Sequence, residues 1–204
     1  MIVNALVEGI LDEAIAARVL TFAGHTLGTC YGKRGWQYIQ QKIGGFAQLA
    51  QLGQPILTLV DFMDTGYACP PELIRQWLPQ PAPNLLLRAV VRESESWLLA
   101  DRNGMAAFLS VASAQLPRDP EREPDPKQTL VNLARRSHQR EILRNLVPQP
   151  NSSAAIGAGY VAMLSGFVRN QWDIAAAQTF APSLARCIAR LNALHSTENH
   201  LPIL

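Results

Sequence analysis

The sequence of 204 residues has few cysteines, and none of them is paired at a metal-binding spacing. Cys30, Cys69 and Cys187 stand far apart and form no Cys-x-x-Cys motif. This pattern argues against a structural zinc site and against a disulfide-stabilised secreted domain. The start of the chain also lacks the basic and uninterrupted apolar segments of a signal peptide, because Asn4 and Glu8 interrupt its apolar run. We therefore expect a cytoplasmic protein.

Long apolar runs and a strong charge of either sign are absent as well. No run approaches the roughly 18 residues of a membrane-spanning helix, so we expect no membrane contact. The net charge of +2 excludes a strongly basic nucleic-acid coat protein and an acidic tail protein. Charged residues make up 17% and apolar residues 48% of the chain. Two explanations stay open for this composition: a surface partly covered by a partner, and a slightly apolar monomer.

Short apolar runs alternate with amphipathic segments in the first half of the chain. Ile2–Val7, Ile56–Val60 and Leu85–Val91 predict buried strands. The segment Ala23–Gly35 predicts a loop with room for one short strand. Apolar strands that alternate with helices are typical of a parallel sheet covered on both faces. The sequence therefore predicts an α/β fold, with a small, mostly parallel sheet flanked by helices.

The second half of the chain predicts helices alone. A Pro-rich, charged stretch at 117–128 predicts a surface linker. One basic helix is expected over Thr129–Leu146, followed by helices over Tyr160–Trp172 and Pro182–Leu194. We therefore expect an α/β core at 1–116 and a helical C-terminal extension at 129–204, packed on or beside that core.

Carboxylates follow each of the three predicted strands. They are Glu8, Asp12, Asp61, Asp64, Glu93 and Glu95. Because the carboxyl ends of parallel strands share one edge, we expect these side chains to lie close together, where their charges repel unless a cation neutralises them. Oxygen ligands favour Mg²⁺ or Mn²⁺ over zinc, and two such ions can clamp the reacting oxygens of a phosphodiester. For each acid alone, a helix N-cap or a helix-dipole partner is the alternative.

The segments that carry these acids resemble the Toprim fold. They read VEGILDE, LVDFMD and ESESWLLAD. More narrowly, the chain resembles a bacterial Toprim-like family related to the nuclease domain of OLD-type (overcoming lysogenisation defect) proteins. That resemblance also covers CPPELIRQWL, RESESWLLADRNGMAAFL, DPKQTLVNLARRS and AQTFAPSLARCIARL. It implies a metal-dependent nuclease acting on DNA, with RNA as the alternative, beside an ATPase partner protein in phage defence.

The resemblance also implies roles for individual residues. Glu8 matches the Toprim glutamate, a metal ligand or general base, and Asp12 matches a second acid of OLD-type sites. Asp61 matches the first Asp of the Toprim Asp-x-Asp motif. Glu95, with Glu93 close by, matches the acid of a later Ser-x-Glu-like element. Lys127 of the Asp-Pro-Lys segment matches a distal catalytic lysine that contacts a phosphate or stabilises the transition state.

One departure from the Toprim pattern leaves the function open. Met63 stands where the motif has its second Asp, and Asp64 comes one residue late. In an extended segment that shift turns the side chain away, whereas in a turn Asp64 still reaches the ion. The alternatives are therefore a catalytically degenerate nucleic-acid-binding or assembly subunit, and a phosphoryl-transfer hydrolase of small substrates.

A run of basic residues further along the chain is a candidate nucleic-acid contact. It contains Arg135, Arg136 and Arg140 on the predicted basic helix. Such a run can hold a phosphate backbone. The alternative is a solvated helix face without a ligand.

Overall fold

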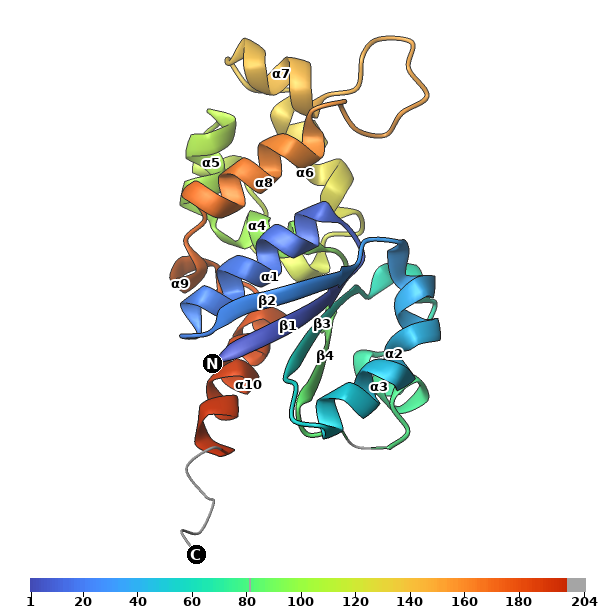
Figure 1. Cartoon of the computed structure of the whole chain (residues 1–204). Helices are drawn as coiled ribbons and strands as arrows, with labels where there is room; N and C mark the ends of the chain where they lie inside the picture. The colour runs from blue at the N-terminus through green and yellow to red at the C-terminus, as the bar shows by residue number, and fades with distance from the viewer. Residues whose placement is uncertain (81, 198–204) are drawn as a thin grey trace, which may run out of the picture.

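The computed structural model describes residues 1–80 and 82–197 and contains a parallel sheet with helices on both faces (Figure 1). The strands are β1 (Ile2–Val7), β2 (Thr26–Gly32), β3 (Ile56–Asp61) and β4 (Leu85–Val90). The α-helices are α1 (Ile10–Phe22), α2 (Gly35–Gln51), α3 (Pro70–Trp77), α4 (Ser94–Ala100), α5 (Arg102–Leu109), α6 (Pro126–Ala134), α7 (Arg140–Leu146), α8 (Tyr160–Asn170), α9 (Ile174–Ala177) and α10 (Pro182–Thr197). Three short 3₁₀ helices are η1 (Met63–Thr65), η2 (Ser113–Gln115) and η3 (Pro120–Arg122). None of the described helices is both long and apolar enough to cross a membrane.

The sheet has the strand order β2-β1-β3-β4, and all its neighbouring strands are parallel. This confirms the predicted α/β class with a parallel sheet and helices in the C-terminal part. β3 and β4 pair along their whole length, from Ile56 opposite Leu85 to Asp61 opposite Val90. The carboxyl ends of β1, β3 and β4 therefore lie next to one another. Figure 1 shows the start of α1 close to that edge of the sheet.

Two predictions about individual elements differ from the structure. Within the segment expected as a loop, β2 is a strand of seven residues that pairs with β1 at the edge of the sheet. The single basic helix over Thr129–Leu146 is wrong, because α6 ends at Ala134 and α7 begins at Arg140. Between them, the Ser137 hydroxyl accepts a hydrogen bond from the backbone N–H of Gln139 at 3.1 Å. Local bonds of this kind compete with helical hydrogen bonds and favour a turn.

Alternate residues of each strand enter two apolar cores, one on each face of the sheet. Leu6, Val60 and Leu87 pack with α2 and α3 on one face. On the other face, a larger cluster begins at Val3 in β1 and continues through α1, α4 and α8 to Leu194 in α10. Figure 1 shows the same division, with α2 and α3 on one side and α1 and α10 on the other.

The start of α6 is held against the α/β part of the molecule by capping and by burial. Asp125 caps the helix by accepting the backbone N–H of Gln128 at 2.7 Å, and Pro126 is buried at the first helical position. In the same stretch, Glu121 accepts the backbone N–H of Ser183 at 2.7 Å. These contacts fix the position of Lys127, which lies in the first turn of α6.

Candidate metal centre

One buried serine links two of the predicted acids. Ser94, which is 2% exposed, is the first residue of α4 and follows the end of β4. Its hydroxyl donates a hydrogen bond to Asp12 Oδ1, and its backbone N–H donates to Asp61 Oδ1 at 2.9 Å. The hydroxyl oxygen also lies 3.1 Å from Asp61 Oδ1. Ser94 therefore connects α1, β3 and α4 at the carboxyl edge of the sheet.

The side chain of Glu8 joins this group through a hydrogen bond to the backbone of Asp61. Its Oε1 accepts the N–H of Asp61 at 2.7 Å. Burial, with a smaller contribution from the negative charges of Asp12 and Asp64, raises the pKa of Glu8 to about 7 against the effect of that hydrogen bond. Burial also raises the pKa of Asp12 and of Asp61, and in Asp61 the neighbouring carboxylates add to the shift. In the absence of a cation, burial therefore disfavours the charged form of all three acids.

Lys127 compensates the charge on the other side of the site. Its Nζ lies 2.8 Å from Glu93 Oε1 and 4.0 Å from Glu95 Oε1, and its backbone N–H donates to Glu93 Oε2 at 3.1 Å. Burial lowers the pKa of Lys127, but Glu95 and Glu93 raise it by more, so the side chain stays charged. Glu95 Oε1 also accepts the hydroxyl of Tyr160 at 3.0 Å. Burial raises the pKa of Glu95 to about 7, although Lys127 opposes this shift.

A small cavity lies between the acids bonded to Ser94 and the side chain of Lys127. Its volume is ≈ 150 Å³, and Asp12, Asp61, Ser94 and Lys127 are among its lining residues. The start of α8 closes the cavity with Tyr160. A water molecule takes up roughly 30 Å³ in the liquid, so the cavity has room for several.

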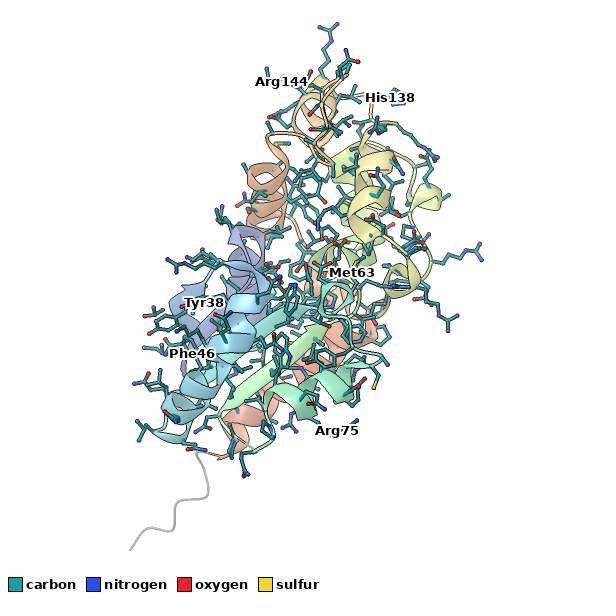
Figure 2. The ribbon with its side chains drawn as sticks, turned by 90° about the vertical axis from the view of Figure 1, so that its right-hand side faces the viewer. Tyr38, Phe46, Met63, Arg75, His138 and Arg144 are labelled. Carbon is teal, nitrogen blue, oxygen red and sulfur yellow. The ribbon has the colours of Figure 1, made fainter. Side chains whose placement is uncertain are left out.

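The residue that departs from the Toprim pattern lies outside this cavity. Asp64 is exposed in η1, and the chain already turns at Phe62, directly after β3. Asp64 affects Glu8 through its charge, without a hydrogen bond to it. Met63 is half-buried, and Figure 2 labels it near the junction of the sheet with the helical part of the molecule.

The predicted basic residues lie on a different part of the surface. Arg135 and Arg140 are exposed and line a groove of ≈ 740 Å³ together with Arg144 and the 147–154 loop. Arg136 instead donates to Gln115 Oε1 at 3.4 Å. Figure 2 shows Arg144 at the end of the molecule that lies farthest from the sheet.

Two residues of the site were not predicted from the sequence. Ser94 had a weak signal, because it stands between two acids at the start of a helix that follows a strand. Tyr160 had none, since it lies 65 positions from the glutamate that it contacts. Both are buried, and both position acids that the sequence did indicate.

The donor chemistry of the site fits a hard divalent cation, although the side chains do not form a ready-made cage. No group of three or more His, Cys, Asp or Glu side chains in the described part of the chain is arranged to hold a metal ion. Glu8, Asp12 and Asp61 nevertheless present carboxylate oxygens, the ligands that Mg²⁺ and Mn²⁺ prefer. Burial raises their pKa values, and a bound cation would favour the charged forms that burial disfavours. These three acids are therefore the candidate ligands, whereas Glu93 is paired with Lys127.

Comparison of the chain with protein-family models, with curated proteins and with solved structures found no match in any of the three. The four-stranded parallel sheet is compatible with a Toprim-like fold. The function is therefore inferred from the residues of the site and from their arrangement.

Proposed function

We propose that this chain is a Toprim-like, Mg²⁺- or Mn²⁺-dependent nuclease that hydrolyses phosphodiester bonds in DNA, with RNA as the alternative substrate. The proposal rests on one arrangement at the carboxyl edge of a parallel sheet: Ser94 bonds both Asp12 and Asp61, and Glu8 accepts the backbone N–H of Asp61. Ligands of open α/β sheets bind at this edge. Buried acids with raised pKa values, next to a cavity, are typical of catalytic sites.

The three acids would hold the metal ion, and Ser94 would keep Asp12 and Asp61 in place. A bound ion of this kind polarises a phosphoryl oxygen and lowers the pKa of a bound water molecule. Without a cation the pKa of Glu8 is about 7, and a bound cation would lower it, so Glu8 would be charged at neutral pH and able to act as a ligand. Lys127 presents a positive charge to the cavity and is suited to contact a phosphate oxygen.

Tyr160 and Glu93 would support that role of the lysine. Glu93 bonds both the backbone and the side chain of Lys127, so it fixes the start of α6 and the direction of the ammonium group. Tyr160 binds Glu95 and closes the cavity from the side of α8. Both residues would therefore position the lysine without contacting the substrate.

The basic groove would bind the nucleic-acid backbone outside the cavity. Its wall is the 147–154 loop, and the same stretch of chain continues to Ile156 and Tyr160, which line the cavity. The groove and the cavity thus share one connecting segment. Arg135, Arg140 and Arg144 would supply contacts to phosphates, which are sensitive to salt but not to sequence.

A second candidate is a catalytically degenerate subunit that binds nucleic acid or assembles with a partner. Two observations favour it: Lys127 already pairs with Glu93, and Asp64 is exposed in η1 and does not line the cavity. Under either candidate, the OLD-type resemblance suggests an ATPase partner. Cleavage activity separates the two candidates.

The test is plasmid cleavage in Mn²⁺ by the wild-type protein, by Glu8→Gln and by Glu13→Gln. Glu13 is a matched control, because it lies five residues after Glu8, in the first turn of α1, but pairs with Lys33 at the surface, at 3.0 Å. We expect cleavage by the wild type and by Glu13→Gln, and a loss of roughly 100-fold or more in Glu8→Gln. Equal cleavage by all three proteins would contradict the assignment of Glu8.

The remaining outcomes select among the alternatives. Plasmid binding without cleavage by the wild type would favour the degenerate subunit. Hydrolysis of p-nitrophenyl phosphate with the plasmid left intact would favour a hydrolase of small phosphorylated substrates. Either result would rule out the nuclease.

A further inference from the structure

A second groove runs along the free edge of the sheet, away from the candidate metal centre. β4 is the last strand in the sheet order, so its outer edge pairs with no strand of the described chain. The groove beside it has a volume of ≈ 420 Å³ and is lined by α3, the segment after α3, β4 and α10. It shares no residue with the cavity at the carboxyl edge.

The groove combines an apolar floor with three arginines. Leu78, Leu85, Leu86 and Leu87 are among its apolar residues. The arginines come from three different elements: Arg75 from α3, Arg88 from β4 and Arg190 from α10. Because α3 and α10 cover opposite faces of the sheet, the positive charges approach the edge of β4 from both sides. Figure 2 labels Arg75 toward the opposite end of the molecule from Arg144.

The side chains of these arginines have no anionic partner among the described residues. None of the three guanidinium groups forms a hydrogen bond or an ion pair there. The Nε atom of Arg88 is buried and lacks an acceptor. Burial lowers the pKa of Arg88, and the positive charges of Arg190 and Arg186 lower it further, while Cys187 opposes them.

An unpaired guanidinium on a strand is unfavourable for the protein alone. A buried donor without an acceptor destabilises the fold, and nearby like charges add to that cost. An oxyanion would remove both effects. Guanidinium groups bind carboxylates and phosphates through paired hydrogen bonds, and three positive charges favour a multiply charged phosphate over a single carboxylate.

We propose that this groove binds a small phosphate-bearing molecule, with its phosphoryl group between Arg88 and Arg190 and its organic part on the apolar floor. The volume falls within the roughly 300–1,000 Å³ of small-molecule sites. Arg75 contributes positive charge from the wall formed by α3. This site is independent of the proposed nuclease function, because it uses neither the acids nor the cavity of the metal centre.

The test is calorimetric titration of the full chain with pyrophosphate, in EDTA and at constant ionic strength. The proteins are the wild type, Arg88→Leu, Arg190→Gln and the control Arg169→Gln. Arg169 is exposed on α8 and lines none of the described grooves, so its variant loses the same charge elsewhere. We expect saturable binding to the wild type and to Arg169→Gln, and at least tenfold weaker binding to the other two variants.

Thermal unfolding shows whether the variants are folded, so that weaker binding can be assigned to the lost arginine. Arg88→Leu should unfold at the same temperature as the wild type or higher, because leucine replaces a buried unpaired donor. A folded Arg88→Leu variant that binds pyrophosphate as well as the wild type would overturn the proposal, since the anion would then bind elsewhere. Absence of saturable binding to the wild type would overturn it as well.

Further ligands test whether the bound phosphate carries an organic part. Adenosine diphosphate that binds more tightly than pyrophosphate, while adenosine alone does not bind, would support an organic part on the apolar floor. Equal affinities for the two phosphates would overturn that part of the assignment. A peptide of alternating glutamate and valine that binds through Arg88 when neither phosphate does would replace the small molecule by a protein partner.

Discussion

The buried position of Glu95 predicts that the stability of the metal-free protein depends on pH in an unusual direction. Glu95 is 2% exposed, and burial raises its pKa from the ordinary 4.5 to about 7. Below pH 4.5 the carboxyl group is protonated in both the folded and the unfolded chain. Between pH 4.5 and 7 the unfolded chain loses this proton while the folded chain keeps it. The free energy of unfolding therefore falls as the pH rises through this range.

The size of the effect follows from the two pKa values. At roughly 1.36 kcal/mol per pKa unit, the change from 4.5 to about 7 corresponds to about 3 kcal/mol. Glu95→Gln removes the titration but keeps an oxygen that accepts the hydroxyl of Tyr160. Relative to the wild type, the variant should gain about 3 kcal/mol between pH 4.5 and pH 8.

Urea unfolding of the metal-free proteins at several pH values between 4.5 and 8 measures this gain. Glu141→Gln is the control, because Glu141 is exposed on α7 and does not line the cavity. The control should follow the wild type at every pH. A stability difference between Glu95→Gln and the wild type that stays constant with pH would contradict a raised pKa of Glu95, as would a variant less stable than the wild type at pH 8.

Three further predictions concern the serine link, a strand end and the basic groove. Ser94→Ala leaves the buried Asp12 carboxylate without its donor and should lower the free energy of unfolding in urea by roughly 1.5–3 kcal/mol. Ser96→Ala removes a buried hydroxyl that has no hydrogen-bond partner and should lower it little. Equal losses in the two variants would contradict the role of the Ser94 link. Gly32→Ala should lower the free energy of unfolding by about 1 kcal/mol or more, because Gly32 has a φ of +94° and a Cβ there would collide with the backbone carbonyl at the end of β1. Gly44→Ala is the control and should not lower the free energy of unfolding, since a Cβ at Gly44 meets open space. Arg140→Gln should weaken DNA binding and reduce its salt slope by about 1 in fluorescence anisotropy, and an unchanged slope would place the nucleic acid elsewhere.

Three strands could be predicted from the sequence because their apolar residues are continuous. Ile2–Val7, Ile56–Asp61 and Leu85–Val90 are buried between two layers of helices, so nearly all their positions are apolar. β2 lies at the edge and is largely exposed on its outer side, so its sequence TLGTCYG carries no such run. The break after Ala134 depends on one local hydrogen bond within a sequence that otherwise favours a helix.

The candidate site was predictable to the extent that it depends on strand ends. Glu8 and Asp61 follow adjacent parallel strands, so their proximity follows from the fold class. The link through Ser94 joins residues 82 positions apart and depends on which strands are neighbours. The position of Asp64 depends on how the chain turns after β3, and the sequence pattern left both directions open.

We propose that Glu8, Asp12 and Asp61 form a site for a divalent cation. Anomalous diffraction from a crystal soaked in Mn²⁺ locates the ion itself, with an Asp61→Asn crystal as the control. We predict an anomalous peak in contact with the carboxylates of Asp12 and Asp61 in the wild type, and its loss in the variant. Absence of a peak at these side chains in the wild type, or a peak of equal height in Asp61→Asn, would contradict the claim.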